Sequence, residues 1–262
     1  MLDSQLFNAQ AQAGNKNTYL QHNLVSDIPG LADVTDTNLV DPWGISMSAA
    51  SPFWISNAGK GNTTLYNGAG SITALVVTIP PGFKGPARGA PTGQVNNGST
   101  VFLLPSGVRS SFIFATEDGT ISAWQTGATA TVMVDNSPSG AVYEGLTSGT
   151  SAAGPVLYAA NFNTGNIDVF GGTWAPVTLA GNFKDPTLPA GFAPFNIMNL
   201  KGSLYVMYAK QNDLKKRDVA GAGNGFVSVF DLNGNFVKRL ISNDVLNSPW
   251  GAAIAPVTWE AF

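Results

Sequence analysis

The sequence contains no cysteine and a single histidine, His22, and both scarcities restrict its chemistry. Without cysteine there is no disulfide, no thiol nucleophile and no cysteine-ligated zinc. A Ser-His-Asp triad would have to use His22, and one histidine is too few for a transition-metal site built from side chains. The segment GLTSGTS (145–151) lacks the G-x-S-x-G pattern of a nucleophile elbow. We therefore interpret His22 as an incidental polar residue.

Charged residues are scarce as well: they make up 11% of the chain, against roughly 25% in an average globular protein. The formal net charge is −3 with 13 basic residues, which argues against a nucleic-acid partner. We interpret the one basic cluster, Lys215-Lys216-Arg217, as a solvated loop. No apolar run approaches the ~18 residues of a membrane span, so we expect no membrane-spanning segment.

The abundant residues are small: the chain has 30 glycines and 16 prolines, and it is 44% hydrophobic. This composition is typical of turn-dense β proteins and of many secreted ones. The first residues, MLDSQLFNAQAQAGNKN, lack the basic and apolar regions of a signal peptide. We expect an extracytoplasmic or secreted protein whose export signal is absent from this chain.

A repeat runs through the sequence, in which a glycine is followed five residues later by an aromatic residue. Its four copies are GNTTLY (61–66), GTISAW (119–124), GNIDVF (165–170) and GFVSVF (225–230). An apolar, strand-like run precedes each copy: 53–56, 111–115, 156–161 and 204–209. Another follows it: 72–79, 130–134, 175–180 and 236–241. A further segment leads into each unit: PWGIS (42–46), PTGQV (91–95), YEGLT (143–147) and PFNIM (194–198).

Four short alternating strands per unit, repeated about every 50 residues, predict an all-β fold, a β-propeller of four-stranded blades. The positions Gly44, Gly93, Gly145, Asn196 and Gly251 recur every 49 to 55 residues. The glycine of each repeat should supply a positive φ for a tight turn, and the aromatic residue should pack between blades. A β-sandwich does not explain a fixed glycine-to-aromatic offset, and a helical repeat does not have period 2.

We predict an irregular segment over 1–16 and a single propeller domain over 17–262. Its blades should span about 40–80, 89–135, 141–183 and 193–243, and the first strand of a fifth should lie in 247–262, at SPWGAA. We expect a chain truncated at both ends, with residues 17–28 forming a strand that pairs with the last blade. An open blade edge would then favour self-association. A complete five-bladed ring with an irregular last blade is the alternative.

Three segments carry a family resemblance: PWGIS near the start, DVAGAGNGFVSVFDLNGNFVKRL (218–240) and SPWGAAIAP. They resemble a poorly characterised bacterial family of NHL-like β-propellers, often six-bladed, some members of which carry a C-terminal exosortase sorting tail. The resemblance implies the propeller fold and an extracytoplasmic origin, and it implies no reaction.

In a propeller, the segments that lead into the innermost strands and the turns between the second and third strands share one face, which usually holds the ligand site. On this turn face we nominate ligand-binding residues: Asp41, Trp43, Asn57, Lys60, Asn161, Asn163, Asn196, Lys210 and Trp250. Such carboxylates and amides could hold calcium, with Glu117, Asp118, Glu144 and Asn196 as its ligands. The alternative is that Asn and Asp favour turns for backbone reasons.

Trp43 and Trp250 either line a rim for a sugar or aromatic ligand or pack between blades. The connections 80–93 and 214–225 are long and rich in glycine, and the second should lie on the turn face as a lid.

Two functions remain open. The first is a non-catalytic scaffold that binds a small molecule, glycan or protein partner. The second is a hydrolase or lyase, lactonase- or glycosidase-like and calcium-dependent in one version, with Glu117, Asp118 and Glu144 as its catalytic acids.

Overall fold

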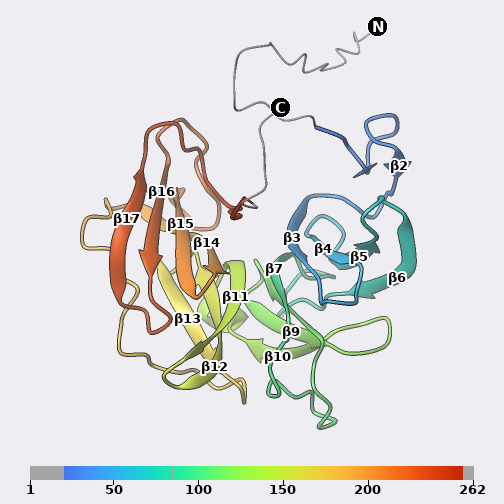
Figure 1. The fold of residues 1–262 in the computed structure, drawn as a ribbon, viewed down its shortest axis with the longest axis horizontal. Helices are drawn as coiled ribbons and strands as arrows, with labels where there is room; N and C mark the ends of the chain where they lie inside the picture. Colours follow the sequence, from blue (N-terminus) through green and yellow to red (C-terminus); the bar gives the residue numbers. More distant parts are fainter. Residues whose placement is uncertain (1–20, 84, 256–262) are drawn as a thin grey trace, which may run out of the picture.

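The computed structural model describes residues 21–83 and 85–255, and it is built from antiparallel sheets (Figure 1). These residues contain no α-helix, only one turn of 3-10 helix at Ser137–Ser139. No helix in the described ranges has the length and apolar character needed to cross a membrane. The all-β prediction is therefore confirmed.

Four sheets follow one another along the chain, and each forms a simple meander. The first contains β3 (Pro42–Ser46), β4 (Phe53–Asn57), β5 (Asn62–Tyr66) and β6 (Ile72–Thr78). The second contains β7 (Pro91–Asn96), β8 (Phe112–Thr116), β9 (Thr120–Trp124) and β10 (Thr131–Asp135). The third contains β11 (Tyr143–Ser151), β12 (Gly154–Asn161) and β13 (Asn166–Gly171). The fourth contains β14 (Phe192–Leu200), β15 (Ser203–Lys210), β16 (Gly225–Phe230) and β17 (Phe236–Ser242).

The third sheet departs from the expected pattern because residues 175–180 form no strand. Only an isolated bridge joins Pro176 to Phe170, and Val177 donates one backbone hydrogen bond to Val169. Proline has no backbone N–H, so it cannot continue a hydrogen-bonded ladder. The fourth sheet departs as well, because residues 211–224 form a long loop where the other sheets have a tight turn. The turn glycines of the first three repeats have the predicted positive φ, +66°, +80° and +73°.

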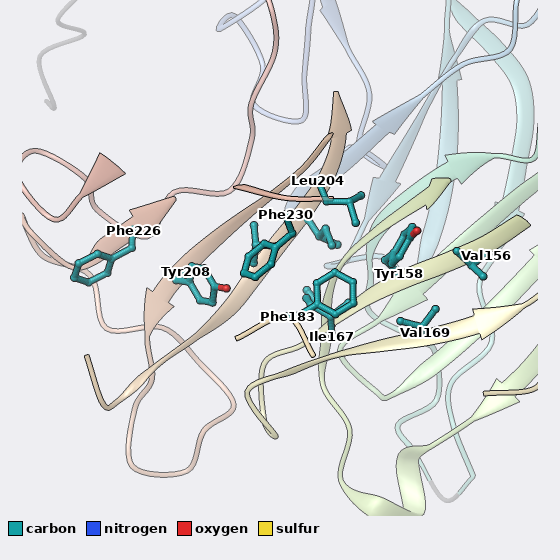
Figure 2. Packing of buried hydrophobic residues seen from close by; sticks show 12 residues of the cluster. Val156, Tyr158, Ile167, Val169, Phe183, Leu204, Tyr208, Phe226 and Phe230 are labelled. Atoms are coloured by element: carbon teal, nitrogen blue, oxygen red, sulfur yellow. The ribbon is translucent and has the colours of Figure 1, made fainter. Parts of the chain in front are cut away.

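The core lies between neighbouring sheets. Successive side chains of a strand point to opposite faces, so a central strand serves two interfaces at once. In β8, Phe112 and Phe114 pack toward the first sheet, whereas Ile113 and Ala115 pack toward the third. Figure 2 shows the interface of the third and fourth sheets, where Tyr158 of β12 and Phe230 of β16 lie in one buried cluster. The repeat aromatics Trp124, Phe170 and Phe230 thus pack between sheets, as predicted.

The innermost strands β3, β7, β11 and β14 approach one another around a central axis (Figure 1). The recurring glycines mark these contacts. A Cβ atom on Gly93 would lie 2.2 Å from the backbone nitrogen of Leu146, and one on Gly44 would lie 2.4 Å from the Thr92 carbonyl oxygen. The Thr92 hydroxyl donates a 2.6 Å hydrogen bond to the Tyr143 carbonyl, which ties β7 to β11.

The terminal regions differ from expectation. In β1 (Val25–Ser26), the chain pairs in parallel with β2 (Val34–Thr35) and not with the last sheet. Residues 249–254 follow the fourth sheet without forming a strand. The predicted irregular segment 1–16, residues 17–20 and the rest of the predicted fifth-blade strand, 256–262, lie outside the described residues.

Candidate functional site

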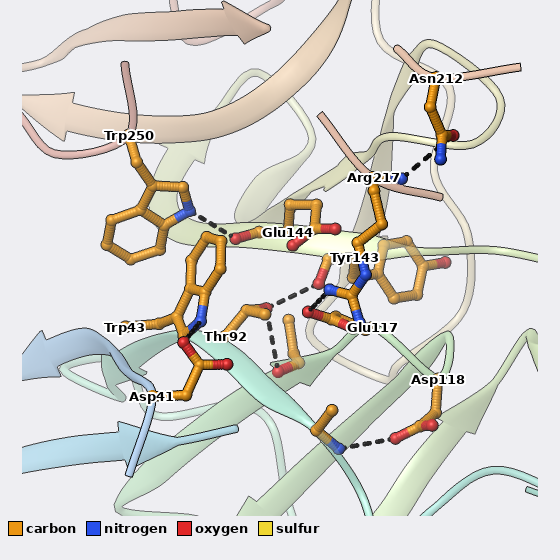
Figure 3. A network of polar contacts seen from close by, with 12 residues as sticks. Asp41, Trp43, Thr92, Glu117, Asp118, Tyr143, Glu144, Asn212, Arg217 and Trp250 are labelled. Carbon is orange, nitrogen blue, oxygen red and sulfur yellow. Dashed lines mark hydrogen bonds and ion pairs between the residues drawn. The ribbon is translucent and has the colours of Figure 1, made fainter. Parts of the chain in front are cut away.

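The turn face carries a compact cluster of acidic and aromatic side chains over the central axis, which we call the mouth (Figure 3). It consists of Asp41, Trp43, Glu117, Glu144, Arg217 and Trp250. These residues come from all four sheets and from the segment that follows the fourth. Five of the six were nominated from sequence.

Two equivalent tryptophans meet in the mouth. The rings of Trp43 and Trp250 make an edge-to-face contact with centroids 5.4 Å apart, and Trp43 makes a second such contact with Phe195 at 5.7 Å. Each indole nitrogen donates a hydrogen bond, from Trp43 to the Asp41 carboxylate and from Trp250 to the Glu144 carbonyl. Both rings are half-buried and pack against the buried cluster that contains Phe195.

The backbone explains why the two Pro-Trp-Gly motifs behave alike. Asp41 and Ser248, the residues that precede them, have φ values of 53° and 45°. This left-handed conformation is uncommon for residues other than glycine. Both motifs therefore start from the same strained turn, which directs the following tryptophan toward the axis.

Glu144 is the most unusual group in the mouth. Its side chain is 1% exposed, and its Oε2 atom has no hydrogen-bond partner among the described residues. Burial raises the pKa of Glu144 well above its ordinary value, and the negative charge of Glu117 raises it further. The neutral, protonated form of Glu144 is therefore favoured more than in an ordinary exposed carboxyl group.

Glu117 and Arg217 form an ion pair next to Glu144. An Arg217 Nη donates to the Glu117 carboxylate at 2.5 Å, and the side chains of Glu117 and Arg217 are 12% and 62% exposed. Burial raises the pKa of Glu117, although the hydrogen bond from Arg217 opposes that effect. The pair joins a turn of the second sheet to the long loop of the fourth, which lies over the mouth.

That loop is tied down at several points. The Asn163 side chain donates to the Lys215 carbonyl at 3.4 Å, and the Gln211 side chain donates to the Phe162 carbonyl. Within the loop, the Asn212 side chain accepts from the backbone nitrogens of residues 216 and 217. These contacts hold the residue 217 backbone close enough for its side chain to reach the second sheet.

The remaining nominated residues lie outside the mouth. Asp118 accepts a 2.7 Å hydrogen bond from the Ala90 backbone and stabilises the connection between the first two sheets. Asn57 and Asn161 are buried, and their amides hydrogen-bond within their own hairpins, to Asn62 and Asp168 respectively. The Asn196 amide donates to the Trp250 carbonyl at 2.7 Å. Lys60 is half-buried and Lys210 is exposed at the rim of this face.

The acids of the turn face do not gather around a point that could hold a cation. In the described part of the chain, no group of three or more His, Asp or Glu side chains has a metal-binding arrangement. Calcium takes six to eight oxygen ligands. Because Asp118 and the Asn196 amide are occupied by backbone contacts, the four nominated ligands do not converge.

Below the mouth, the innermost strands line an open channel cavity of about 790 Å³. Its walls come from β3, β7, β11, β14 and residues 250–253, and none of the described residues that line it is charged. The charged groups of this region are therefore confined to the mouth.

Comparison with known proteins finds relatives without an assigned activity. No family model matches the chain. An uncharacterised protein of Acanthamoeba polyphaga mimivirus is 31% identical over 247 residues, which is 89% of this chain and 60% of the relative. A second mimivirus protein is 28% identical and aligns with 91% of this chain and 65% of its own length. The chain thus spans about 60% to 65% of the length of these curated relatives.

These relatives correct the resemblance drawn from the sequence motifs. The chain is similar to viral proteins, and neither an NHL family nor a bacterial origin is shown, so that prediction was wrong. Motifs such as PWGIS and GNGFVSVF reflect the glycine and aromatic positions that sheets stacked around an axis require. They therefore indicate an architecture and do not identify a lineage.

Similar solved structures have a propeller-like arrangement of sheets. Hydrazine synthase of Kuenenia stuttgartiensis has a TM-score of 0.49 at 18% identity and is matched over 82% of this chain and 53% of that one. Virginiamycin B lyase of Staphylococcus aureus has a TM-score of 0.46 at 14% identity, with coverage of 76% and 54%. A chain of a nidogen–laminin complex has a TM-score of 0.45 at 13% identity, with coverage of 78% and 63%. Such low scores carry no information about activity.

Proposed function

We propose that this chain is an extracytoplasmic, non-catalytic binding scaffold that presents its turn face to a small molecule, glycan or protein partner. The observation that carries the proposal is the state of the two acids in the mouth. Glu144 is almost completely buried, and Glu117 is held in an ion pair. A hydrolytic site needs a free base as well as an acid, and in this chain the Glu117 carboxylate beside Glu144 is occupied by Arg217.

The extracytoplasmic location rests on composition. Surfaces poor in lysine and glutamate are common among exported β proteins, and this chain is 11% charged. Protease protection in intact cells or virions, compared with lysates, tests this part of the proposal. Rapid digestion only after lysis would place the protein inside and contradict it.

The proposal includes a blade count. The four sheets are four blades of a propeller, and the described residues that follow them, 249–255, lie where the innermost strand of a next blade would begin. In support, the Asn196 amide binds the Trp250 carbonyl, so the segment after the fourth sheet lies beside β14 as the next innermost strand would. Self-association through an exposed blade face follows from this count. Light scattering tests it, and a monomer at every concentration would contradict it.

The binding function is tested by screening the immobilised chain against glycan and peptide arrays. We expect a retained ligand whose binding is weakened by Glu117→Gln. Asp213→Asn removes an exposed carboxylate of the long loop of the fourth sheet, outside the mouth, and serves as the control. Unchanged binding in Glu117→Gln would place the ligand site elsewhere.

One observation favours the hydrolase or lyase alternative: Glu144, whose pKa is raised by burial, lies close enough to Glu117 for that charge to raise its pKa further. Such a pair suits general acid catalysis once the Arg217 loop moves away. Turnover of a glycoside or lactone that is lost in Glu144→Gln would support this alternative and overturn the scaffold.

A further inference from the structure

Negative charge exceeds positive charge in the mouth. Glu117 and Asp41 of the mouth, together with Asp218 of the long loop, each raise the pKa of Glu144. The single cation that faces them is Arg217, which also carries the only ion pair that the described residues make in the mouth. A second positive group would therefore be attracted to this site.

Glu144 supplies an unoccupied acceptor. Its Oε2 atom is buried and without a partner, although burying an unsatisfied polar atom costs about 1–3 kcal/mol. Native proteins retain such atoms where a ligand or a functional step uses them. A cationic donor placed against Glu144 would satisfy the atom and lower the pKa of its carboxyl group.

The walls of the mouth suit a flat cation. Trp43 and Trp250 contact each other edge to face and stay half-exposed. A guanidinium group is planar, stacks on aromatic faces and donates hydrogen bonds to carboxylates in a fork. An ammonium group is not planar and cannot donate in a fork, and calcium would need more oxygen ligands than this site supplies.

Arg217 shows how such a group would bind. Its guanidinium group is on the Glu117 carboxylate and influences Glu144, but its side chain is mostly exposed and stands on a loop rather than on a strand. Because the Arg217 side chain is mostly exposed, a competing guanidinium group can displace it from Glu117 while the rest of the loop keeps its contacts.

We propose that the mouth recognises a guanidinium group, as carried by an arginine side chain of a partner, and that Arg217 occupies its place in the unliganded chain. This inference rests on the proposed binding function and specifies the chemistry of its ligand. In the bound state, Glu117 and Glu144 accept hydrogen bonds from the ligand, and the Arg217 side chain lies aside.

The test is calorimetric titration of methylguanidinium into the wild type and into variants that lack the Arg217 guanidinium group, at constant ionic strength. We expect Arg217→Ala to bind methylguanidinium about tenfold more tightly than the wild type, the ratio that corresponds to one charge-assisted hydrogen bond. Lys216→Ala, which removes the neighbouring exposed cation, should bind like the wild type. The double variant Arg217→Ala/Glu144→Gln should lose the gain. If Arg217→Ala does not fold, Arg217→Gln carries the same expectation.

Several results would overturn the inference. These are equal binding of methylammonium and methylguanidinium, calcium binding in place of either, or no gain over Lys216→Ala. An Arg-containing peptide that binds more tightly than free L-arginine would indicate a protein partner. Tighter binding of free L-arginine would overturn the claim that the guanidinium group belongs to a protein.

The proposed function can fail separately. Methylguanidinium binding without any array ligand would support the site chemistry and overturn the scaffold. A retained neutral glycan without methylguanidinium binding would do the opposite.

Discussion

The packing of the innermost strands makes a sharp prediction at Gly93. An alanine there would place its Cβ atom 2.2 Å from the Leu146 nitrogen and 2.7 Å from the Gly145 carbonyl carbon. Ordinary contacts between such atoms are about 3.5 Å. Because the neighbours are backbone atoms of β11, no side chain can rotate away, and β7 and β11 must separate.

The expected cost of Gly93→Ala follows from that geometry. Overpacking a well-packed interior costs about 1–3 kcal/mol and occasionally more. The overlap here is with backbone on one of the inter-sheet interfaces, so we expect the upper end, about 3 kcal/mol. For a chain of this size, that lowers Tm by about 6–12 °C.

Gly251 provides the matched control. It occupies the equivalent position of the second Pro-Trp-Gly motif, and a Cβ atom there would meet nothing within 4 Å. Gly251→Ala should therefore leave the free energy of unfolding within about 0.5 kcal/mol of the wild type. Urea and thermal unfolding of both variants provide the measurement. Equal stabilities of Gly93→Ala and Gly251→Ala would refute the close approach of the innermost strands.

Three more variants test other contacts. Burial raises the pKa of Glu144 in the folded state, so the stability of the wild type should fall as pH rises above about 4.3, the pKa of an unfolded Glu. Glu144→Gln removes this titration, so the Tm of the variant should rise relative to the wild type over the same pH range. Hydrogen bonds from Arg239 and Ser228 outweigh the effect of burial and lower the pKa of Asp185 to about 2. Asp185→Asn should therefore lower the free energy of unfolding by about 2 kcal/mol at neutral pH. Urea titrations should show this difference between variant and wild type disappearing as pH falls from about 4 toward 2. Phe230→Ala should cost about 3–5 kcal/mol in the same assay, because Phe230 is fully buried between the third and fourth sheets.

Sequence alone predicted the strands well because their signal is local. Alternating apolar residues and a turn glycine specify a hairpin without reference to the rest of the chain. The predicted strand at 175–180 failed because Pro176 interrupts the ladder. Proline has no backbone N–H to donate, and the alternation of apolar residues from which the strand was predicted contains no information about missing donors.

The candidate site was predicted in part. Glu117, Glu144, Trp43 and Trp250 were nominated because a propeller places its turns on one face. Arg217 was missed, since its partner Glu117 is 100 residues away in the sequence and nothing local distinguishes it from the neighbouring lysines. Asn57 and Asn161 were nominated by the same turn pattern, but they support their own hairpins.

The ring packing and the mouth depend on the same geometry. Glycines let the innermost strands approach closely, and β7 is tied to β11 through Thr92 and Tyr143. This narrow spacing lets Trp43 of the first sheet touch Trp250 beyond the fourth. It also places Glu144 within the field of Glu117. A wider ring would separate the acids, solvate Glu144 and leave Arg217 unable to affect both. The glycine spacing in the sequence therefore determines the electrostatics of the mouth as well as the stacking of the sheets.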